Sequence, residues 1–314
     1  MVPGGRGREA PTLNTPTKIR VVLKIDVDTF RGTAEGVPAM LEDLAAAGVR
    51  ASFFWTLGPD NSGRAIFRVF TKPGFLTKML RTNAAKMYGW KTALYGTLLP
   101  APKIGRRCAA TLRRARDLGH EVGLHAWDHV LWQDRLHRLD RAEIDSTLER
   151  GTIEFAEIFG APPTSFAAPA WYMTDDGWEV LDKRGFDYVS VSRGAAPPFF
   201  PCVRERVLDL LEIPTTLPTL DEDLGRDGIT PENYVDRLVS RYRPGETEVL
   251  TLHAETEGLA YRPLFRALLE RHRAMGIEHL TAAEYAAEMR EQAIAREVRL
   301  GEIPGRSGRV AVVA

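Results

Sequence analysis

The sequence IRVVLKIDVD occupies residues 19–28, and the fold can be worked out from this stretch. Its first eight residues are mostly apolar and β-branched, which is typical of a strand buried on both faces of a parallel sheet. The stretch ends at Asp26 and Asp28, whose carboxylates project to the same side because side chains alternate along an extended backbone. Catalytic groups in α/β barrels and open α/β sheets gather at the carboxyl ends of strands. The stretch therefore predicts a parallel sheet and the position of a functional site on it.

Further strands follow at regular intervals, and helical segments separate them. We predict helices over 35–47 and 106–118, and a third that begins after Asp140 and ends near residue 159. The six further predicted strands are 51–57, 121–125, 165–167, 188–191, 211–213 and 248–253. Seven strands that alternate with helices favour an α/β fold with a parallel sheet, either open or closed into a barrel.

The domain organisation is interrupted once. Residues 58–104 are too long for an ordinary connection, so we predict a functional insertion after the second strand. We expect residues 1–18 to be a disordered extension and not a signal peptide, since they lack an apolar centre. Residues 19–299 are expected to form a single catalytic domain, and residues 300–314 a C-terminal tail. No run of about 18 apolar residues is present, so no membrane-spanning helix is expected.

The charge of the 314 residues is balanced overall but not locally. There are 42 Lys and Arg and 42 Asp and Glu, a balance that argues against a dedicated duplex-binding protein. Residues 61–116 nevertheless contain thirteen basic residues and no acidic one, which leaves a net charge of −13 on the rest of the chain. The thirteen are Arg64, Arg68, Lys72, Lys78, Arg81, Lys86, Lys91, Lys103, Arg106, Arg107, Arg113, Arg114 and Arg116. Because aromatic and aliphatic residues lie among them, we expect part of this segment to contact an anionic membrane surface. The alternative is that the segment packs on the barrel and pairs its charges with the acidic rest of the chain.

Three predicted strand ends carry residues that could bind a metal. Asp26 and Asp28 end the first strand, and His253 ends the last. His125 and His129 end the third strand with the i, i+4 spacing that lets two imidazoles face one ion from a helical turn. Each feature alone has an ordinary structural explanation, such as a surface pair of histidines or a turn. Together, at one edge of the sheet, they predict a catalytic metal site of one Asp and two His.

These motifs resemble those of the polysaccharide deacetylase family, carbohydrate esterase family 4. The matching stretches are IDVDTFRG at 25–32, GPDNSG at 58–63, YGW at 88–90, GLHAWDH at 123–129, PTTLPTLDE at 214–222 and HAETEG at 253–258. Together they are most similar to the branch that deformylates 4-deoxy-4-formamido-L-arabinose linked to undecaprenyl phosphate. The resemblance covers residues 18–308 and implies a distorted (β/α) barrel of about seven parallel strands.

The resemblance also implies roles for the strand-end residues. Asp28, His125 and His129 would hold one divalent metal ion of the Zn, Mn or Co type. Asp26 would be the general base and His253 the general acid. The third family motif, which normally supplies an arginine beside the base, reads AAPAW at 167–171, so we take Arg193 as its replacement.

Five residues are candidates for contact with substrate: Trp171, Arg193, Asp221, Glu255 and Glu257. Glu255 and Glu257 could bind sugar hydroxyls or the new ammonium, or could be solvated loop charges. Asp221 has the same two interpretations. Trp171 could stack on a sugar ring or pack in the core.

Three functions remain open from the sequence. The first is deformylation of the undecaprenyl-linked sugar at the cytoplasmic face of the inner membrane, which the resemblance connects with lipid A modification and resistance to cationic peptides. The second is deacetylation of another N-acetylated glycan. The third is a lipid- or nucleic-acid-binding protein without catalytic activity, which would need none of the five strand-end residues. The first is favoured; it implies a lipid-linked sugar substrate and no nucleic acid, and we identify no protein partner.

Overall fold

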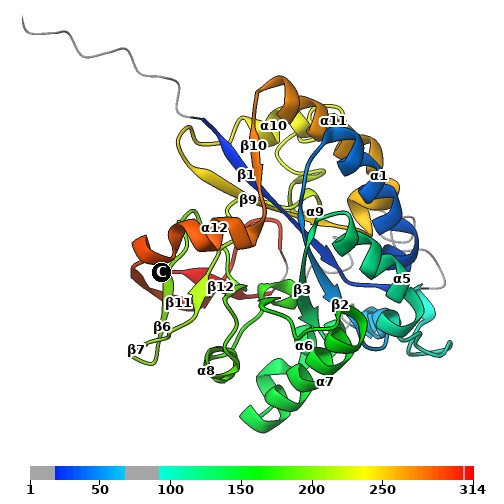
Figure 1. Ribbon diagram of the computed structural model, residues 1–314, viewed down its shortest axis with the longest axis vertical. Coiled ribbons are helices and arrows are strands. Elements are labelled where there is room, and N and C mark those ends of the chain that lie inside the picture. The colour runs from blue at the N-terminus through cyan, green and yellow to red at the C-terminus, as the bar shows by residue number, and fades with distance from the viewer. Residues whose placement is uncertain (1–17, 68–91, 307) are drawn as a thin grey trace, which may run out of the picture.

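The strand β1, Arg20–Val27, lies inside a sheet of eight parallel strands (Figure 1). The structure is a computed structural model that describes residues 18–67, 92–306 and 308–314. β9 pairs with β1 along most of its length, while β2 pairs with its second half and β10 with its first three residues. From β2 the sheet continues through β3, β4 and β5 to β8. The other strands are β2 Ser52–Thr56, β3 Glu121–Ala126, β4 Ser165–Ala167, β5 Tyr188–Ser190, β8 Leu211–Glu212, β9 Thr247–His253 and β10 Glu278–Leu280.

The sheet curves into a distorted barrel, which confirms the predicted fold class. The N–H groups of Thr216 and Leu217, just after β8, donate to the carbonyl oxygen of Val249 in β9 at 3.1 and 3.4 Å. This short contact bridges the two ends of the sheet. All seven predicted strands are present, and β10 is an eighth that the sequence analysis did not identify.

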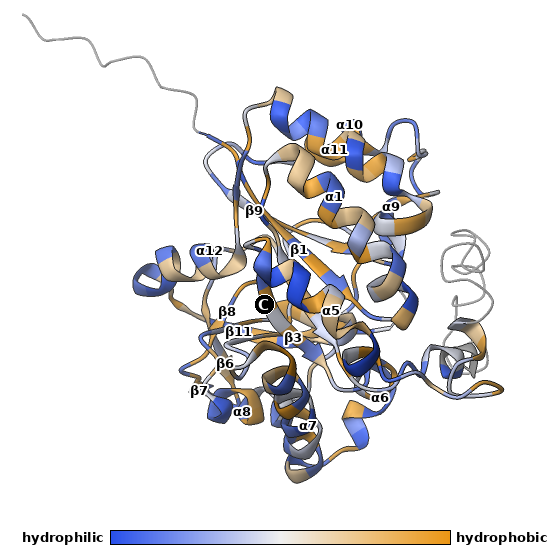
Figure 2. Ribbon diagram, turned by 45° about the vertical axis from the view of Figure 1, so that its right-hand side comes forward, coloured by the Kyte–Doolittle hydropathy of each residue, from blue (hydrophilic) through white to orange (hydrophobic). Residues whose placement is uncertain are grey.

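Helices cover the outside of the barrel (Figure 1). α1 ends at Gly48, whose φ of 67° is the left-handed conformation that glycine adopts without strain. α7 begins with a capping box between Asp140 and Glu143, as predicted from their spacing. Figure 2 shows hydrophobic and hydrophilic residues alternating along α7 and α11, as expected for helices with one face on the sheet. The α-helices are α1 Val37–Ala47, α5 Ile104–Asp117, α6 His129–Arg135, α7 Arg141–Phe159, α8 Asp175–Arg184, α9 Leu220–Asp223, α10 Tyr234–Val239, α11 Arg262–Ala274 and α12 Ala282–Met289.

Single helical turns complete the connections. Two of these have π-helical geometry, η1 Gly32–Gly36 and η6 Thr256–Ala260, and follow β1 and β9. The 3₁₀ turns are η2 Ser62–Phe67, η3 Thr92–Leu94, η4 Leu136–Arg138, η5 Pro169–Trp171 and η7 Arg290–Gln292.

A second sheet of four strands differs from the sequence-based expectation. It contains β6 Phe200–Val203, β7 Arg206–Val207, β11 Ala295–Gly301 and β12 Val310–Val313, in the order β12-β11-β6-β7. The expected tail at 300–314 therefore includes a paired strand, in which Val310 and Ala311 are buried. The N–H of Arg193 donates to the carbonyl oxygen of Ala311 at 2.9 Å, which attaches this strand to the loop after β5. β6 pairs with β7 and β11 with β12 as neighbours in the chain, and the pairing of β6 with β11 joins two distant segments.

The two ends of the expected insertion at 58–104 lie together. Pro59 forms a bridge with Lys103, and the N–H of Gly63 donates to the carbonyl oxygen of Tyr95 at 3.0 Å. Residues 68–91, and with them Lys72, Lys78, Arg81 and Lys86, lie outside the described residues, as do residues 1–17. Within the part of the chain that is described, no helix is long and apolar enough to span a bilayer.

Candidate metal centre and active site

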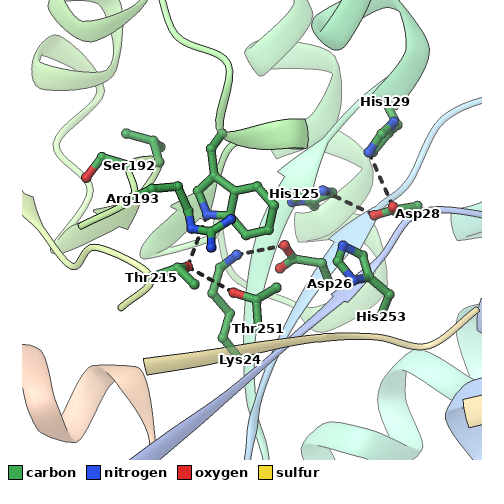
Figure 3. Close-up of polar contacts among 12 residues, drawn as sticks. Lys24, Asp26, Asp28, His125, His129, Ser192, Arg193, Thr215, Thr251 and His253 are labelled. Atoms are coloured by element: carbon green, nitrogen blue, oxygen red, sulfur yellow. Dashed lines mark hydrogen bonds and ion pairs between the residues drawn. The ribbon is translucent and has the colours of Figure 1, made fainter. Parts of the chain in front are cut away.

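Asp28, His125 and His129 come together at the carboxyl end of the barrel. Asp28 follows β1, His125 lies in β3, and His129 is the first residue of α6. Asp28 Oδ1 lies 3.2 Å from His125 Nε2, and Asp28 Oδ2 lies 3.3 Å from His129 Nε2 (Figure 3). One donor atom from each residue lies within 4.8 Å of the others. The three residues predicted to be metal ligands therefore converge on one point.

The donor set fits a divalent metal. Asp28 Oδ1 is buried and makes no well-directed hydrogen bond among the described residues, although His125 Nε2 lies close to it. Burial opposes ionisation of Asp28, but the neighbouring His129 and His125 outweigh it and hold the pKa of this carboxyl well below its usual value. One carboxylate oxygen and two imidazole nitrogens form a shell that first-row divalent ions accept, with positions left open for water and substrate.

Residues at the start of the insertion hold the loop between His125 and His129 in place. Asp128 caps α6 by accepting from the N–H of Leu131 at 2.9 Å, and its other oxygen accepts from Asn61 Nδ2 at 2.6 Å. Asp60 accepts from the N–H of Phe30 at 2.8 Å, close to Asp28 in the chain. The GPDNSG stretch thus joins the loops after β1, β2 and β3.

Asp26 has a partner that the sequence analysis did not identify. Lys24 Nζ donates to Asp26 Oδ2 at 2.7 Å, and both side chains are buried (Figure 3). Burial lowers the pKa of Lys24 below its usual value even though Asp26 favours its charged form. Asp26 Oδ1 has no hydrogen-bond partner among the described residues. One oxygen of the carboxylate is therefore fixed and the other remains available to accept a proton.

A signal for Lys24 was present in the sequence. Lys24, Asp26 and Asp28 occupy alternate positions of one strand, so their side chains project to the same side. A lysine in the middle of an apolar strand is rarely buried without an acidic partner. Arg193, expected to be the base's cationic partner, instead pairs with Glu222 through Nη1–Oε1 at 2.7 Å and Nη2–Oε2 at 2.9 Å.

His253 ends β9 directly beside Asp26 in the register of the two strands. The backbone N–H of His253 donates to Glu257 Oε2 at 2.9 Å. Burial would lower the pKa of the imidazole, but Asp28, Asp221, Asp26 and Glu257 outweigh this effect and raise it above its usual value. The surroundings of His253 therefore favour the protonated form that a general acid needs.

The two glutamates after His253 are buried and fix the backbone of the site. Glu255 Oε1 accepts from the N–H groups of Asp28 and Thr29 at 3.0 and 2.7 Å, and from the Thr29 hydroxyl at 2.8 Å. Burial raises the pKa of Glu255 to about 8 and that of Glu257 to about 7. Gly32 leaves room for the Glu255 carboxyl, since a Cβ there would lie 1.9 Å from Oε1. Both residues thus position their neighbours instead of forming part of a solvated loop.

Asp221, by contrast, is partly exposed. It lies in α9, where its Oδ1 accepts from the Thr219 hydroxyl at 2.6 Å, and its charge helps to raise the pKa of His253.

Trp171 is only 1% exposed, and cations gather over its ring. Lys24 Nζ lies 5.2 Å, Arg193 Cζ 4.5 Å and Arg306 Cζ 4.6 Å from the ring centroid. The indole Nε1–H donates to Thr215 Oγ1 at 3.0 Å, and the backbone N–H donates to the carbonyl oxygen of Ala168. Ala170 and Trp171 both have positive φ, 57° and 51°, a strained conformation often found at functional sites. Trp171 lies edge-on to His253, with ring centroids 6.3 Å apart.

Comparisons with known proteins agree with this geometry. Residues 14–189 match the family described as polysaccharide deacetylase. A protein of Shewanella sediminis, named as a probable 4-deoxy-4-formamido-L-arabinose-phosphoundecaprenol deformylase ArnD, is 41% identical over 84% of this chain and 85% of its own length. A protein of Wigglesworthia glossinidia brevipalpis with the same name is 33% identical over 89% of this chain and 97% of its own.

Solved structures share the fold. A crystal structure described as a polysaccharide deacetylase from Mycobacterium smegmatis aligns with a TM-score of 0.63 at 18% identity and covers 96% of this chain and 100% of its own.

Proposed function

The chain belongs to the polysaccharide deacetylase family, and from this premise we propose that it hydrolyses the formamide of 4-deoxy-4-formamido-L-arabinose linked to undecaprenyl phosphate. The products would be formate and the 4-amino sugar lipid. The observation that carries the proposal is the convergence of Asp28, His125 and His129 beside Asp26 and His253 at one end of the barrel. The names of the two relatives support the choice of substrate.

Asp28, His125 and His129 are the residues that would hold the metal. A divalent ion there supplies Lewis acidity, which polarises an amide carbonyl and makes water more acidic. The same three residues suit Zn, Mn or Co, since this donor set accepts several first-row ions.

Asp26 and His253 divide the proton transfers between them. Asp26 Oδ1 accepts the proton of the attacking water, while Lys24 holds the other oxygen in place. The water oxygen bonds to the formyl carbon, and the bond between this carbon and the sugar nitrogen then breaks. Protonated His253 donates to the departing nitrogen, because an amine anion is a very poor leaving group. Asp26 lies beside the Lys24 cation and His253 lies among carboxylates, and these neighbours suit a base and an acid respectively.

We place this reaction at the cytoplasmic face of the inner membrane, where an undecaprenyl-linked substrate would be presented. The support is the basic and apolar composition of residues 61–116. Association with vesicles of anionic lipid should require this composition, weaken as salt is added, and fall when Lys72, Lys78, Arg81 and Lys86 become Gln. Equal binding to neutral vesicles would contradict a role for the charge.

The deciding experiment compares two substrates. Purified protein is incubated with the formyl and the acetyl forms of the undecaprenyl-linked sugar, and the products are identified by liquid chromatography and mass spectrometry. We expect the amino sugar lipid and formate from the first and little product from the second. Asp28→Asn protein provides the control for a contaminating hydrolase. Faster release of acetate would favour the alternative function, deacetylation of a glycan.

A further inference from the structure

Arg306 comes into the active-site region from the C-terminal segment, between β11 and β12. Its guanidinium lies over Trp171, 4.6 Å from the ring centroid, and its Nη1 lies 3.2 Å from Glu222 Oε1. Only 12% of its side chain is exposed. No motif that we identified in the sequence includes this residue, and its place in the site depends on the second sheet.

The conformation of the backbone next to Arg306 is tightly constrained. Gly305 has a φ of 84°, and a Cβ on it would lie 2.4 Å from the carbonyl oxygen of Glu222. Any other residue at 305 would therefore be strained and would push the segment away from α9. β12 fixes the far end of the segment by pairing with β11 and by bonding to Arg193.

In the cluster around Trp171, two guanidinium groups contact one carboxylate. Lys24 pairs with Asp26, and Arg193 and Arg306 both contact the carboxylate of Glu222, with the charge of Asp221 nearby. Burial would raise the pKa of Glu222, and the charge of Asp221 acts in the same direction, yet the two guanidinium groups outweigh both and lower it below its usual value. Arg193 is 7% exposed, and its buried Nε has no hydrogen-bond partner among the described residues. A buried guanidinium N–H without an acceptor is unfavourable, so this cluster favours a further anionic acceptor.

We propose that Arg306, supported by Arg193 and Trp171, binds the phosphodiester anion that joins the sugar to its lipid. This inference rests on the proposed function, because the formamide and the phosphate of that substrate lie at opposite ends of one sugar ring. Trp171 contacts the guanidinium groups and also lies edge-on to the proposed acid, His253. The cluster therefore lies next to the proposed catalytic residues, where the phosphate end of the sugar would be expected. Guanidinium groups bind phosphate oxygens in pairs and keep their charge at any physiological pH.

The test separates recognition of phosphate from catalysis. Wild type, Arg306→Gln and Arg306→Lys are assayed on a short-chain prenyl phosphodiester of the formamido sugar and on its uncharged methyl glycoside, both in neutral detergent. For Arg306→Gln we expect KM for the phosphodiester to rise about tenfold to a hundredfold, as for a lost charged hydrogen bond. The kinetics on the methyl glycoside should stay unchanged, and Arg306→Lys should be intermediate.

Arg309→Gln is the matched control, since Arg309 lies in the same segment but is exposed and donates to the carbonyl oxygen of Leu300. Equal losses on both substrates, or no loss on either, would overturn the proposal. So would a variant that loses binding to phosphatidylglycerol vesicles but keeps its KM for the phosphodiester, because the anion would then be a lipid headgroup.

A binding measurement distinguishes failure of this inference from failure of the proposed function. Calorimetric titration with the methyl phosphodiester of the unformylated sugar requires no turnover. If wild type hydrolyses neither formamide but binds this ligand more tightly than Arg306→Gln protein does, the anion site stands and the proposed function fails. If wild type is active and the two proteins bind the ligand equally, the anion site is wrong. Thermal unfolding of each variant checks that the fold is kept.

Discussion

Two pairs of histidines in this protein have nearly the same geometry but different surroundings. The rings of His125 and His129 have centroids 5.4 Å apart and an interplanar angle of 39°, and those of His272 and His279 have values of 5.0 Å and 34°. Asp28 faces both rings of the first pair. The second pair lies toward the opposite end of β1, where His279 in β10 is level with Val21.

The second pair faces no carboxylate in the contacts described. His272 Nδ1 and His279 Nε2 share a hydrogen bond of 2.8 Å, and the Tyr242 hydroxyl lies 2.7 Å from His272 Nε2. Burial lowers the pKa of His272 to about 3 and that of His279 to about 4, so both rings are neutral at physiological pH. The comparison teaches that two close imidazoles do not define a cation site. What distinguishes the first pair as a candidate metal site is the carboxylate of Asp28, which faces both rings.

Removing that carboxylate should have the largest effect. In Asp28→Asn protein we expect metal content and turnover both to fall to background, and His125→Ala and His129→Ala should behave in the same way. The reason is that two imidazoles alone hold a divalent ion weakly. Elemental analysis of the purified proteins together with the deformylation assay checks this. His279→Gln protein, altered in the other pair, should keep its metal; full occupancy in Asp28→Asn protein would show that the ligand is another residue.

Changing the acid or the base should separate metal binding from chemistry. Asp26→Asn and His253→Ala proteins should keep their metal and lose turnover by on the order of a hundredfold or more, the usual effect of removing a general acid or base. The same elemental analysis and assay provide the readout. Near-normal turnover of His253→Ala protein would mean that another group is the acid, with Glu255 as the first candidate.

Replacing Lys24 should have a smaller effect on turnover than either of these changes. Lys24→Met leaves the Asp26 carboxylate buried without its partner, which typically costs about 3–5 kcal/mol of stability. We expect turnover to fall about tenfold as Asp26 loses its fixed orientation. Denaturant unfolding and kinetics measure the two effects. The double variant Lys24→Met/Asp26→Asn should regain much of the lost stability, and an additive loss would show that the two side chains are not coupled.

Protonation of His272 and His279 should affect only the stability of the fold, and only at acidic pH. The pKa of each ring is about 6.5 in the unfolded chain and lower in the fold, so the unfolded state binds protons that the native state does not. Stability is therefore complete above pH 6.5 and decreases as the pH falls toward 4, by about 1.4 kcal/mol per pH unit for each proton. Unfolding of His279→Gln protein at several pH values should show a shallower decrease than wild type. The exposed His137→Gln serves as the control, and an unchanged slope in His279→Gln protein would contradict the assignment.

The strands of the barrel were predictable because each has a strong local pattern. Residues such as those of β1 and β9 form apolar runs that only a strand buried on both faces explains, and glycines and capping residues mark the helices between them. β10 and the four strands of the second sheet are short or exposed on one side. Their sequences lack such long buried apolar runs, and the pairings of β6 with β11 and of β10 with β1 join distant segments of the chain, so they could not be predicted locally.

The proposed metal ligands, acid and base could be named from the sequence because they lie at strand ends and within recognisable motifs. Glu255 and Glu257 could be named in the same way, but not their positions, since their hydrogen bonds to Thr29 and His253 form only in the folded chain. Burial then decided that neither is a solvated charge.

The sequence by itself determined the alternation of seven barrel strands with helices, the five residues at the strand ends, and the uneven distribution of charge. Only the tertiary structure decided which cation accompanies which carboxylate. Arg193, which was expected beside Asp26, pairs with Glu222, and Arg306 reaches the same carboxylate across 84 positions of the chain. The physical reason is that a strand or helix follows from neighbouring residues, whereas the partner of a buried charge depends on distances between side chains from different strands and loops.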